Sequence, residues 1–98
     1  MKMLSCWRCK TEMPMLDENE WEKADALWKQ GFRRERVPIY ERFQPLRDYY
    51  KQVTGYEETN HLAILHHRIS QYGKPCEKCG KPLRTPKAAL CAACGWQP

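Results

Sequence analysis

Residues 76–96, CEKCGKPLRTPKAALCAACGW, contain two Cys-x-x-Cys-Gly segments, and the spacing between them decides how this part of the chain folds. Each segment predicts a tight turn, called a knuckle below, in which Gly80 or Gly95 accommodates an unusual backbone angle. The eleven residues between the cysteine pairs suffice for a short hairpin that returns the second knuckle over the first. We therefore predict one closed, structural Zn²⁺ site, because four thiolates leave no open position for water; its ligands are Cys76, Cys79, Cys91 and Cys94. The other interpretation, two disulfides or free thiols, finds no further support in the chain.

Length and composition agree with a metal-stabilised chain. A protein of 98 residues buries only a modest core, and structural zinc can contribute on the order of 10 kcal/mol or more to folding. No stretch approaches the length of a membrane span, and the start MKMLSCWRCK lacks an apolar signal core. We expect a cytoplasmic protein, where thiols stay reduced and cysteine pairs tend to bind metal.

The formal net charge of +5 overstates how basic the protein is. Four thiolates and one Zn²⁺ together contribute −2, so the loaded chain carries about +3. Such a small excess does not by itself predict nucleic-acid binding.

The middle of the chain reads as helical. Asp17 with Glu20 predicts a capping box at the start of the first helix, an apolar stripe follows, and Gly31 is the predicted end. The stripe consists of Trp21, Ala24, Leu27 and Trp28. A second stripe begins at Ile39 and continues through Pro45, which should kink that helix or split it into two pieces; its other members are Phe43, Leu46, Tyr50 and Val53.

A third helix is predicted from about His61 to Gln71, with Asn60 as its N-cap. On that helix His66 falls on the apolar face and His67 points roughly away from it. The predicted fold is thus mainly α: about three helices, the second kinked at Pro45, and a C-terminal zinc-ribbon β-hairpin. We expect residues 1–73 to form a helical domain with an N-terminal Cys-x-x-Cys knuckle, and residues 74–98 to form the ribbon.

The remaining cysteine pair, Cys6 and Cys9 in SCWRCK, has three interpretations. It could form a second zinc site with His66 and a fourth ligand, either His61 or His67. It could exchange with one ribbon knuckle to complete a single site, or it could remain a pair of reduced thiols packed beside Trp7. A Cys-x-x-Cys pair is a better metal half-site than a core motif, but adjacent histidines on a helix point about 100° apart.

Residues 76–96 resemble the short zinc-ribbon family, in which a Cys-x-x-Cys-Gly knuckle and a Pro-Leu strand start are followed by a brief loop and a second knuckle. Here Lys81-Pro82-Leu83 corresponds to the strand start. The resemblance implies a fold and a metal but no particular function. The rest of the chain loosely resembles small uncharacterised bacterial proteins that begin with CWRC-like and MPML-like segments and end in a ribbon, which implies a small stand-alone protein.

Three classes of function follow from these patterns. Catalysis is disfavoured because the predicted metal site is closed, so no catalytic residue is assigned. Nucleic-acid binding, in transcription or RNA metabolism, is the alternative, since basic residues surround the ribbon and Trp96 or Tyr72 could stack on a base. Our main hypothesis is a protein-binding role, for example that of an immunity-type protein neutralising a bacterial toxin or effector. Its expected contact surface consists of Arg33, Arg34, Arg36, Tyr40 and Tyr49.

Overall fold

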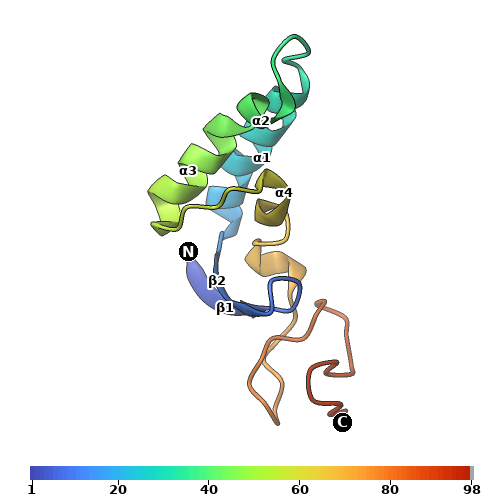
Figure 1. Cartoon of the computed structure of the whole chain (residues 1–98). Coiled ribbons are helices and arrows are strands. Elements are labelled where there is room, and N and C mark those ends of the chain that lie inside the picture. The colour runs from blue at the N-terminus through green and yellow to red at the C-terminus, as the bar shows by residue number, and fades with distance from the viewer. Residues whose placement is uncertain (98) are drawn as a thin grey trace.

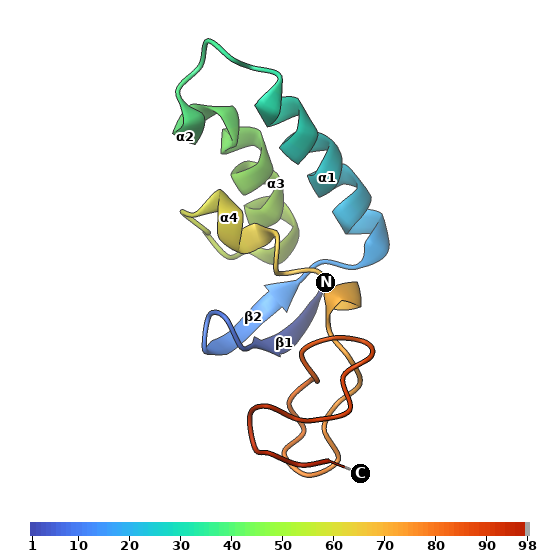
Figure 2. The ribbon, with the colours of Figure 1, turned by 90° about the vertical axis from the view of Figure 1, so that its right-hand side faces the viewer.

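The computed structural model describes residues 1–97, which form an elongated molecule measuring 50 × 23 × 23 Å (Figure 1). A pair of long helices occupies one end, an N-terminal β-hairpin lies in the middle, and the cysteine-rich C-terminal segment occupies the other end (Figure 2). The protein is therefore a mixed α and β chain, and the prediction of a mainly α fold with a C-terminal β-hairpin is wrong in this respect.

The β-hairpin consists of β1 (Lys2–Cys6) and β2 (Thr11–Met15), paired antiparallel from Lys2 opposite Met15 to Cys6 opposite Thr11. Its turn is the first Cys-x-x-Cys segment. A two-stranded sheet leaves each strand with a free edge, and for this reason it tolerates Pro14 within β2.

Helix α1 (Glu18–Phe32) begins as predicted. The Glu20 backbone N–H donates to Asp17 Oδ1 (2.8 Å), and the Asp17 N–H donates to Glu20 Oε1 (3.0 Å), which completes the capping box. The helix continues past Gly31 to Phe32, so Gly31 is not its end. A Cβ atom at Gly31 would lie 2.4 Å from a ring carbon of Phe43, which shows how closely the two helical segments approach.

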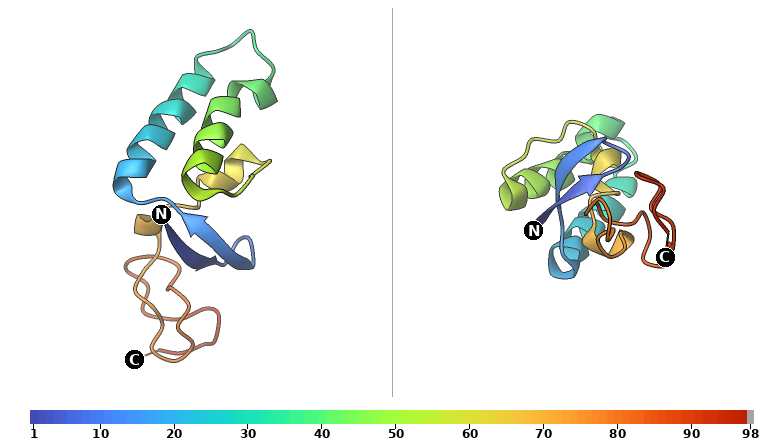
Figure 3. Two further views of the ribbon diagram at one scale, coloured as in Figure 1. Left: turned by 90° about the vertical axis from the view of Figure 1, so that its left-hand side faces the viewer. Right: turned by 90° about the horizontal axis from the view of Figure 1, so that it is seen from below.

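The second predicted helix divides into α2 (Ile39–Arg42) and α3 (Gln44–Thr54). The break lies at Phe43 and not at Pro45, because a proline in the first turn of α3 loses no helical hydrogen bond. Gly55 caps α3 in the left-handed conformation (φ 76°). Helices α1 and α3 pack side by side (Figure 3) around a core made of Leu16, Ala24, Leu46, Tyr50 and Ile64.

The third predicted helix is much shorter than expected. Asn60 caps it, but α4 spans only His61–Ile64, and a separate 3-10 turn covers Ile69–Gln71. Between them the chain pairs with Leu16, whose N–H donates to His67 O (2.7 Å) and whose carbonyl accepts from the Ile69 N–H (2.9 Å). This tertiary pairing takes the His67 carbonyl and the Ile69 N–H, which a continuing helix would use, whereas the N–H groups of residues 65–67 still bond to carbonyls three residues back.

The C-terminal segment contains no β-strand within residues 74–97. The isolated bridge between Pro75 and Pro82 flanks the first knuckle and does not join the legs of the hairpin predicted between the two knuckles. Around it the Leu83 N–H donates to Lys74 O (3.0 Å) and the Cys76 N–H donates to Lys81 O (2.8 Å). Within the part of the chain described, no helix is both long and apolar enough to cross a bilayer.

Candidate metal centres

The C-terminal cluster brings together the four cysteines that the spacing predicted. In each knuckle the glycine takes φ +79° and its N–H donates to the carbonyl of the first cysteine: Gly80 to Cys76 (2.9 Å) and Gly95 to Cys91 (2.7 Å). The two turns therefore have the same build. Their metal-ligating atoms all lie within 4.8 Å of one another.

The sulfur separations distinguish a metal site from disulfides. Cys76 Sγ lies 3.7 Å from Cys94 Sγ, and Cys79 Sγ lies 3.6 Å from Cys91 Sγ. A disulfide needs about 2.05 Å, whereas sulfurs held about 2.3 Å from a tetrahedral Zn²⁺ lie about 3.8 Å apart. All four thiols are free. The arrangement fits a tetrahedral thiolate shell.

The electrostatics of this cluster favour the thiolate of Cys76 and oppose the thiolate of Cys94. Burial disfavours the Cys76 anion, but hydrogen bonds from the backbone of Cys79 and Lys78 outweigh it and lower the pKa of Cys76 to about 6. At Cys94 a backbone hydrogen bond involving Trp96 lowers the pKa of the thiol. Burial and the neighbouring thiols raise it and together prevail, so the pKa of Cys94 is raised to about 11. The Cys94 thiolate therefore forms at neutral pH only with a bound cation beside it.

A second cluster lies where the β-hairpin meets the segment after α4. Its four ligand atoms also lie within 4.8 Å of one another, and they belong to Cys6, Cys9, His66 and His67. Cys6 Sγ is 3.3 Å from His66 Nδ1, and Cys9 Sγ is 3.3 Å from His67 Nε2. Of the three interpretations of the N-terminal pair, this geometry fits the separate metal site.

The N-terminal knuckle has the same turn as the two in the ribbon, with one difference. The Lys10 N–H donates to Cys6 O (2.8 Å), as the knuckle glycines do, and Lys10 takes φ 60°. It is the one non-glycine residue with positive φ among residues 1–97. A lysine thus occupies the left-handed position that Gly80 and Gly95 fill elsewhere.

Adjacent histidines converge here because they are not on a helix. Helix α4 ends at Ile64, residues 65–67 form a tighter turn, and the chain becomes extended at Arg68, which pairs with Leu16. Arg68 anchors this path, donating from Nε and Nη2 to the two carboxylate oxygens of Glu18 (3.0 and 2.7 Å), and this contact lowers the pKa of Glu18 to about 2. The two imidazoles then lie with ring centroids 4.8 Å apart.

Tyr50 determines which nitrogen of His67 faces the cysteines. Its hydroxyl is fully buried, and its single proton goes to the carbonyl of Pro14 (2.5 Å), which can only accept. The hydroxyl oxygen, 3.0 Å from His67 Nδ1, must then accept from an Nδ1–H. This tautomer leaves the lone pair on Nε2, the nitrogen beside Cys9. Metal-ligating histidines commonly carry such a partner on their other nitrogen.

Burial keeps Cys9, His66 and His67 of this cluster uncharged in the absence of a cation. Desolvation, aided by neighbouring His66, lowers the pKa of His67 to about 4, and desolvation with repulsion from Arg8 lowers the pKa of His66. Desolvation also raises the pKa of Cys9 to about 11. Neutral imidazoles are the form that binds metal.

The prediction of which of these two histidines faces the protein interior was wrong. His67, predicted to point away from the core, is fully buried, and His66 is half-buried. His61, the other suggested fourth ligand, lies outside the cluster and stacks on Phe43 with ring centroids 4.2 Å apart. The helical-wheel argument failed because α4 ends before either ligand.

The predicted partner-binding residues do not form one group. Arg33, Arg34 and Arg36 are exposed between α1 and α2, and Tyr40 is exposed beside them on α2. Tyr49 instead packs against the α1–α3 core, with Lys23 Nζ 5.3 Å from its ring centroid.

Comparisons with protein-family models, with curated proteins and with solved structures found no match for this chain. The resemblance of residues 76–96 to short zinc ribbons is therefore supported only by the two cysteine and histidine clusters themselves.

Proposed function

We propose that both clusters hold Zn²⁺ and that the protein is a non-catalytic binding protein that the two ions stabilise. The first cluster offers four sulfurs, and the second offers two sulfurs and two imidazole nitrogens. Both sets suit zinc and fill a tetrahedral shell, which leaves no position for a substrate or an activated water. Loss of either ion should cost folding stability and not a chemical step.

We further propose that the protein binds a protein partner through the end of its helical pair. This surface, the helical tip, comprises Phe32, Arg33, Arg34, Arg36, Ile39 and Tyr40. Phe32, Ile39 and Tyr40 are 56, 64 and 57 % exposed, an unusual exposure for three large apolar side chains so close together. This exposed apolar group is the observation that carries the proposal.

The helical tip is also pre-organised. Arg47, itself buried, donates from Nη2 to the Tyr40 carbonyl, and its guanidinium lies 3.7 Å from the centre of the Tyr40 ring. Phe32 packs edge-on against Trp28 with centroids 4.7 Å apart. Side chains held in place before binding lose less entropy on docking.

Charge complementarity specifies the kind of partner. None of the three loop arginines forms an ion pair within residues 1–97. Arginine and aromatic residues next to one another are typical of interface anchors. A partner with acidic groups around an apolar depression fits this surface, and an immunity-type role, in which the partner is a toxin or effector enzyme, is one concrete form of the proposal.

The test compares two charge reversals of equal size. Zinc-loaded protein is used to isolate a partner from nuclease-treated lysate, and the binding is then measured with the purified partner. Substitution of Arg33, Arg34 and Arg36 by Glu should reduce the association rate at low salt at least tenfold, because steering depends on such charges. The control replaces Lys2, Lys74 and Lys87, all exposed and outside the helical tip, by Glu.

Equal loss in both triple variants, or no loss in the arginine variant, contradicts binding at the helical tip. The immunity-type form makes an additional demand. The purified partner must be an enzyme whose activity falls when the zinc-loaded protein is added, and an unaffected activity rules this form out.

A further inference from the structure

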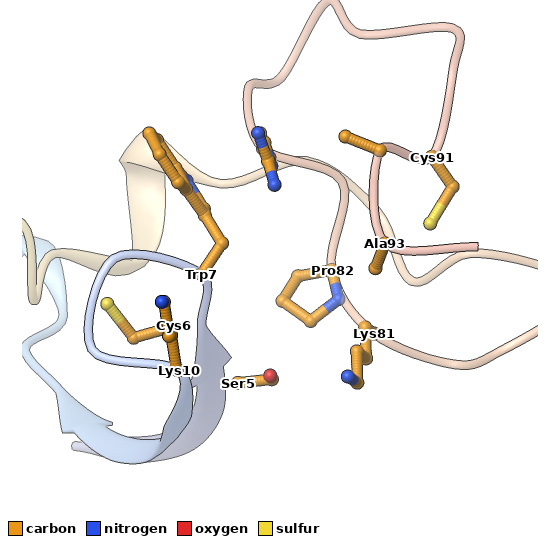
Figure 4. A pocket seen from close by; sticks show the side chains of 10 residues that line it. Ser5, Cys6, Trp7, Lys10, Lys81, Pro82, Cys91 and Ala93 are labelled. Atoms are coloured by element: carbon orange, nitrogen blue, oxygen red, sulfur yellow. The ribbon is translucent and has the colours of Figure 1, made fainter. Parts of the chain in front are cut away.

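The N-terminal knuckle and the ribbon enclose a cleft of about 380 Å³ (Figure 4), called the Trp7 cleft below. Both knuckle systems contribute to its walls: Ser5, Trp7 and Lys10 come from the hairpin side, and Lys81, Arg84 and Ala93 come from the ribbon side. Its volume lies within the range of small-ligand sites. Its lining residues belong to the hairpin and the ribbon, and none belongs to the helical tip.

The lining of the Trp7 cleft is cationic. Lys10, Lys81 and Arg84 are its cationic residues, and no carboxylate lines it. Cys6 and Cys91, one from each candidate metal centre, also contribute to the lining. None of the three forms an ion pair within the described part of the chain. Three unpaired cations around one opening attract an anionic ligand.

Lys10 is held in the cleft wall against its backbone preference. The left-handed conformation is unfavourable for an L-residue with a Cβ atom, and the two equivalent positions in the ribbon are glycines. Backbone outliers of this kind concentrate at functional sites. The ammonium group of Lys10 gives a reason for this exception, because glycine would remove one of the three cations.

Trp7 adds an aromatic surface to this cationic site. Its side chain is 39 % exposed, and the guanidinium groups of Arg84 and Arg8 lie 4.4 and 4.8 Å from a Trp7 ring centroid. Indole and guanidinium planes both stack on nucleic-acid bases. The two aromatic residues that the sequence suggested for this purpose are less accessible: Tyr72 is buried and Trp96 packs within the ribbon.

We propose that the Trp7 cleft binds a nucleotide unit, with Lys10, Lys81 and Arg84 contacting phosphate and the Trp7–Arg84 surface stacking on the base. The source is either a free nucleotide or single-stranded nucleic acid. A simpler role for the cations is to balance the charge of the adjacent tetrathiolate centre, and it makes a different prediction: their removal should weaken zinc binding and leave nucleotide binding absent.

The experiment uses the full-length, zinc-loaded chain and measures anisotropy of labelled single-stranded DNA and RNA 12-mers. AMP, inorganic phosphate, a duplex and polyglutamate serve as competitors. If three phosphates are contacted, affinity should fall roughly 20-fold between 50 and 200 mM salt. Competition by AMP as strong as that of an unlabelled 12-mer assigns the site to free nucleotides, and weaker competition assigns it to single strands; both outcomes support the cleft.

Lys10→Gly is the decisive variant because it removes a cation and at the same time places glycine at a left-handed backbone position that suits it. It should fold at least as well as the wild type and still bind the 12-mer at least fivefold more weakly. Trp7→Ala should weaken binding by a similar or larger factor, since it removes the aromatic surface on which the base stacks. Lys87→Ala, an exposed ribbon cation outside the cleft, is the matched control and should bind normally.

Three results overturn the proposal. The first is no salt-sensitive binding of the 12-mers. The second is equal binding by Lys10→Gly and the wild type. The third is displacement by polyglutamate as effective as by an oligonucleotide, which would assign the cleft to an acidic protein.

Discussion

The buried hydroxyl of Tyr50 orients His67 within the N-terminal candidate metal centre. Tyr50 accepts from His67 Nδ1 and donates to the Pro14 carbonyl, so it joins α3, β2 and the histidine segment at one point. No pattern in the sequence identified this role, because Tyr50 lies on the apolar stripe and reads as ordinary core. The hydrogen bond emerges only when three separate segments meet.

Tyr50→Phe should therefore weaken metal binding at one centre selectively. Phenylalanine keeps the ring but leaves His67 Nδ1–H without an acceptor in a buried place, and loss of such an outer partner typically costs 10–100-fold in metal affinity. Competition with a chromophoric chelator should show one ion released more readily and the other unchanged. Tyr49→Phe, whose ring contacts neither cluster, should behave as the wild type; equal affinities in both variants would rule out the role of Tyr50.

The knuckle glycines should differ from an ordinary surface glycine in their response to substitution. A Cβ atom at Gly80 would meet nothing within 4 Å, so Gly80→Ala introduces no clash and only the left-handed φ of +79° opposes it. We expect a loss of roughly 1–2 kcal/mol in the free energy of unfolding. Chemical denaturation of the zinc-loaded protein measures this loss. Lys10→Gly should instead increase the free energy of unfolding. A neutral Gly80→Ala would mean that the knuckle relaxes to another turn.

At the scale of elements, local signals predicted where structure begins better than where it ends. The capping box at Asp17 and the cap at Asn60 both form, since each depends on residues three positions apart or fewer. The end of α4 was not predictable, because Leu16, far away in the sequence, takes the hydrogen bonds that would continue it. The N-terminal hairpin was not predicted because its two strands are only five residues long and β2 contains Pro14.

Gly31→Ala tests the contact between α1 and the start of α3. In an exposed helix this change stabilises by roughly 0.5–1 kcal/mol, but here the new methyl group would lie 2.4 Å from the Phe43 ring and 3.1 Å from the Arg42 carbonyl. We expect the clash to prevail and the protein to lose about 1–3 kcal/mol. Thermal unfolding gives the sign, with Ala26→Gly on the exposed face of α1 as a reference for helix propensity alone. A stabilised Gly31→Ala would show that the helices separate easily.

At the scale of the molecule, the sequence predicted the chemistry of the two ends more reliably than the path between them. The ribbon ligands follow from spacing alone, since two knuckles eleven residues apart have few other ways to use four thiols. The second centre draws its ligands from opposite ends of the chain, with Cys6 and His66 sixty residues apart. Its fourth ligand could not be chosen between His61 and His67 without knowing that α4 ends at Ile64.

Removal of one ion should unfold one part of the molecule and spare the rest. The buried residues form three separate clusters: one between α1 and α3, one around Cys6 and Tyr72, and one around Cys76 and Leu83. The ribbon cluster contains little apolar surface besides its ligands, so it depends on its metal more than the α1–α3 core does.

Cys79→Ser should therefore abolish hydrogen-exchange protection of the Cys91 and Gly95 amides, while the amides of α3 stay protected. Cys9→Ser should leave the ribbon amides protected and loosen the hairpin. Loss of protection along the whole chain in either variant would show instead that the two metal centres and the helices unfold as one cooperative unit.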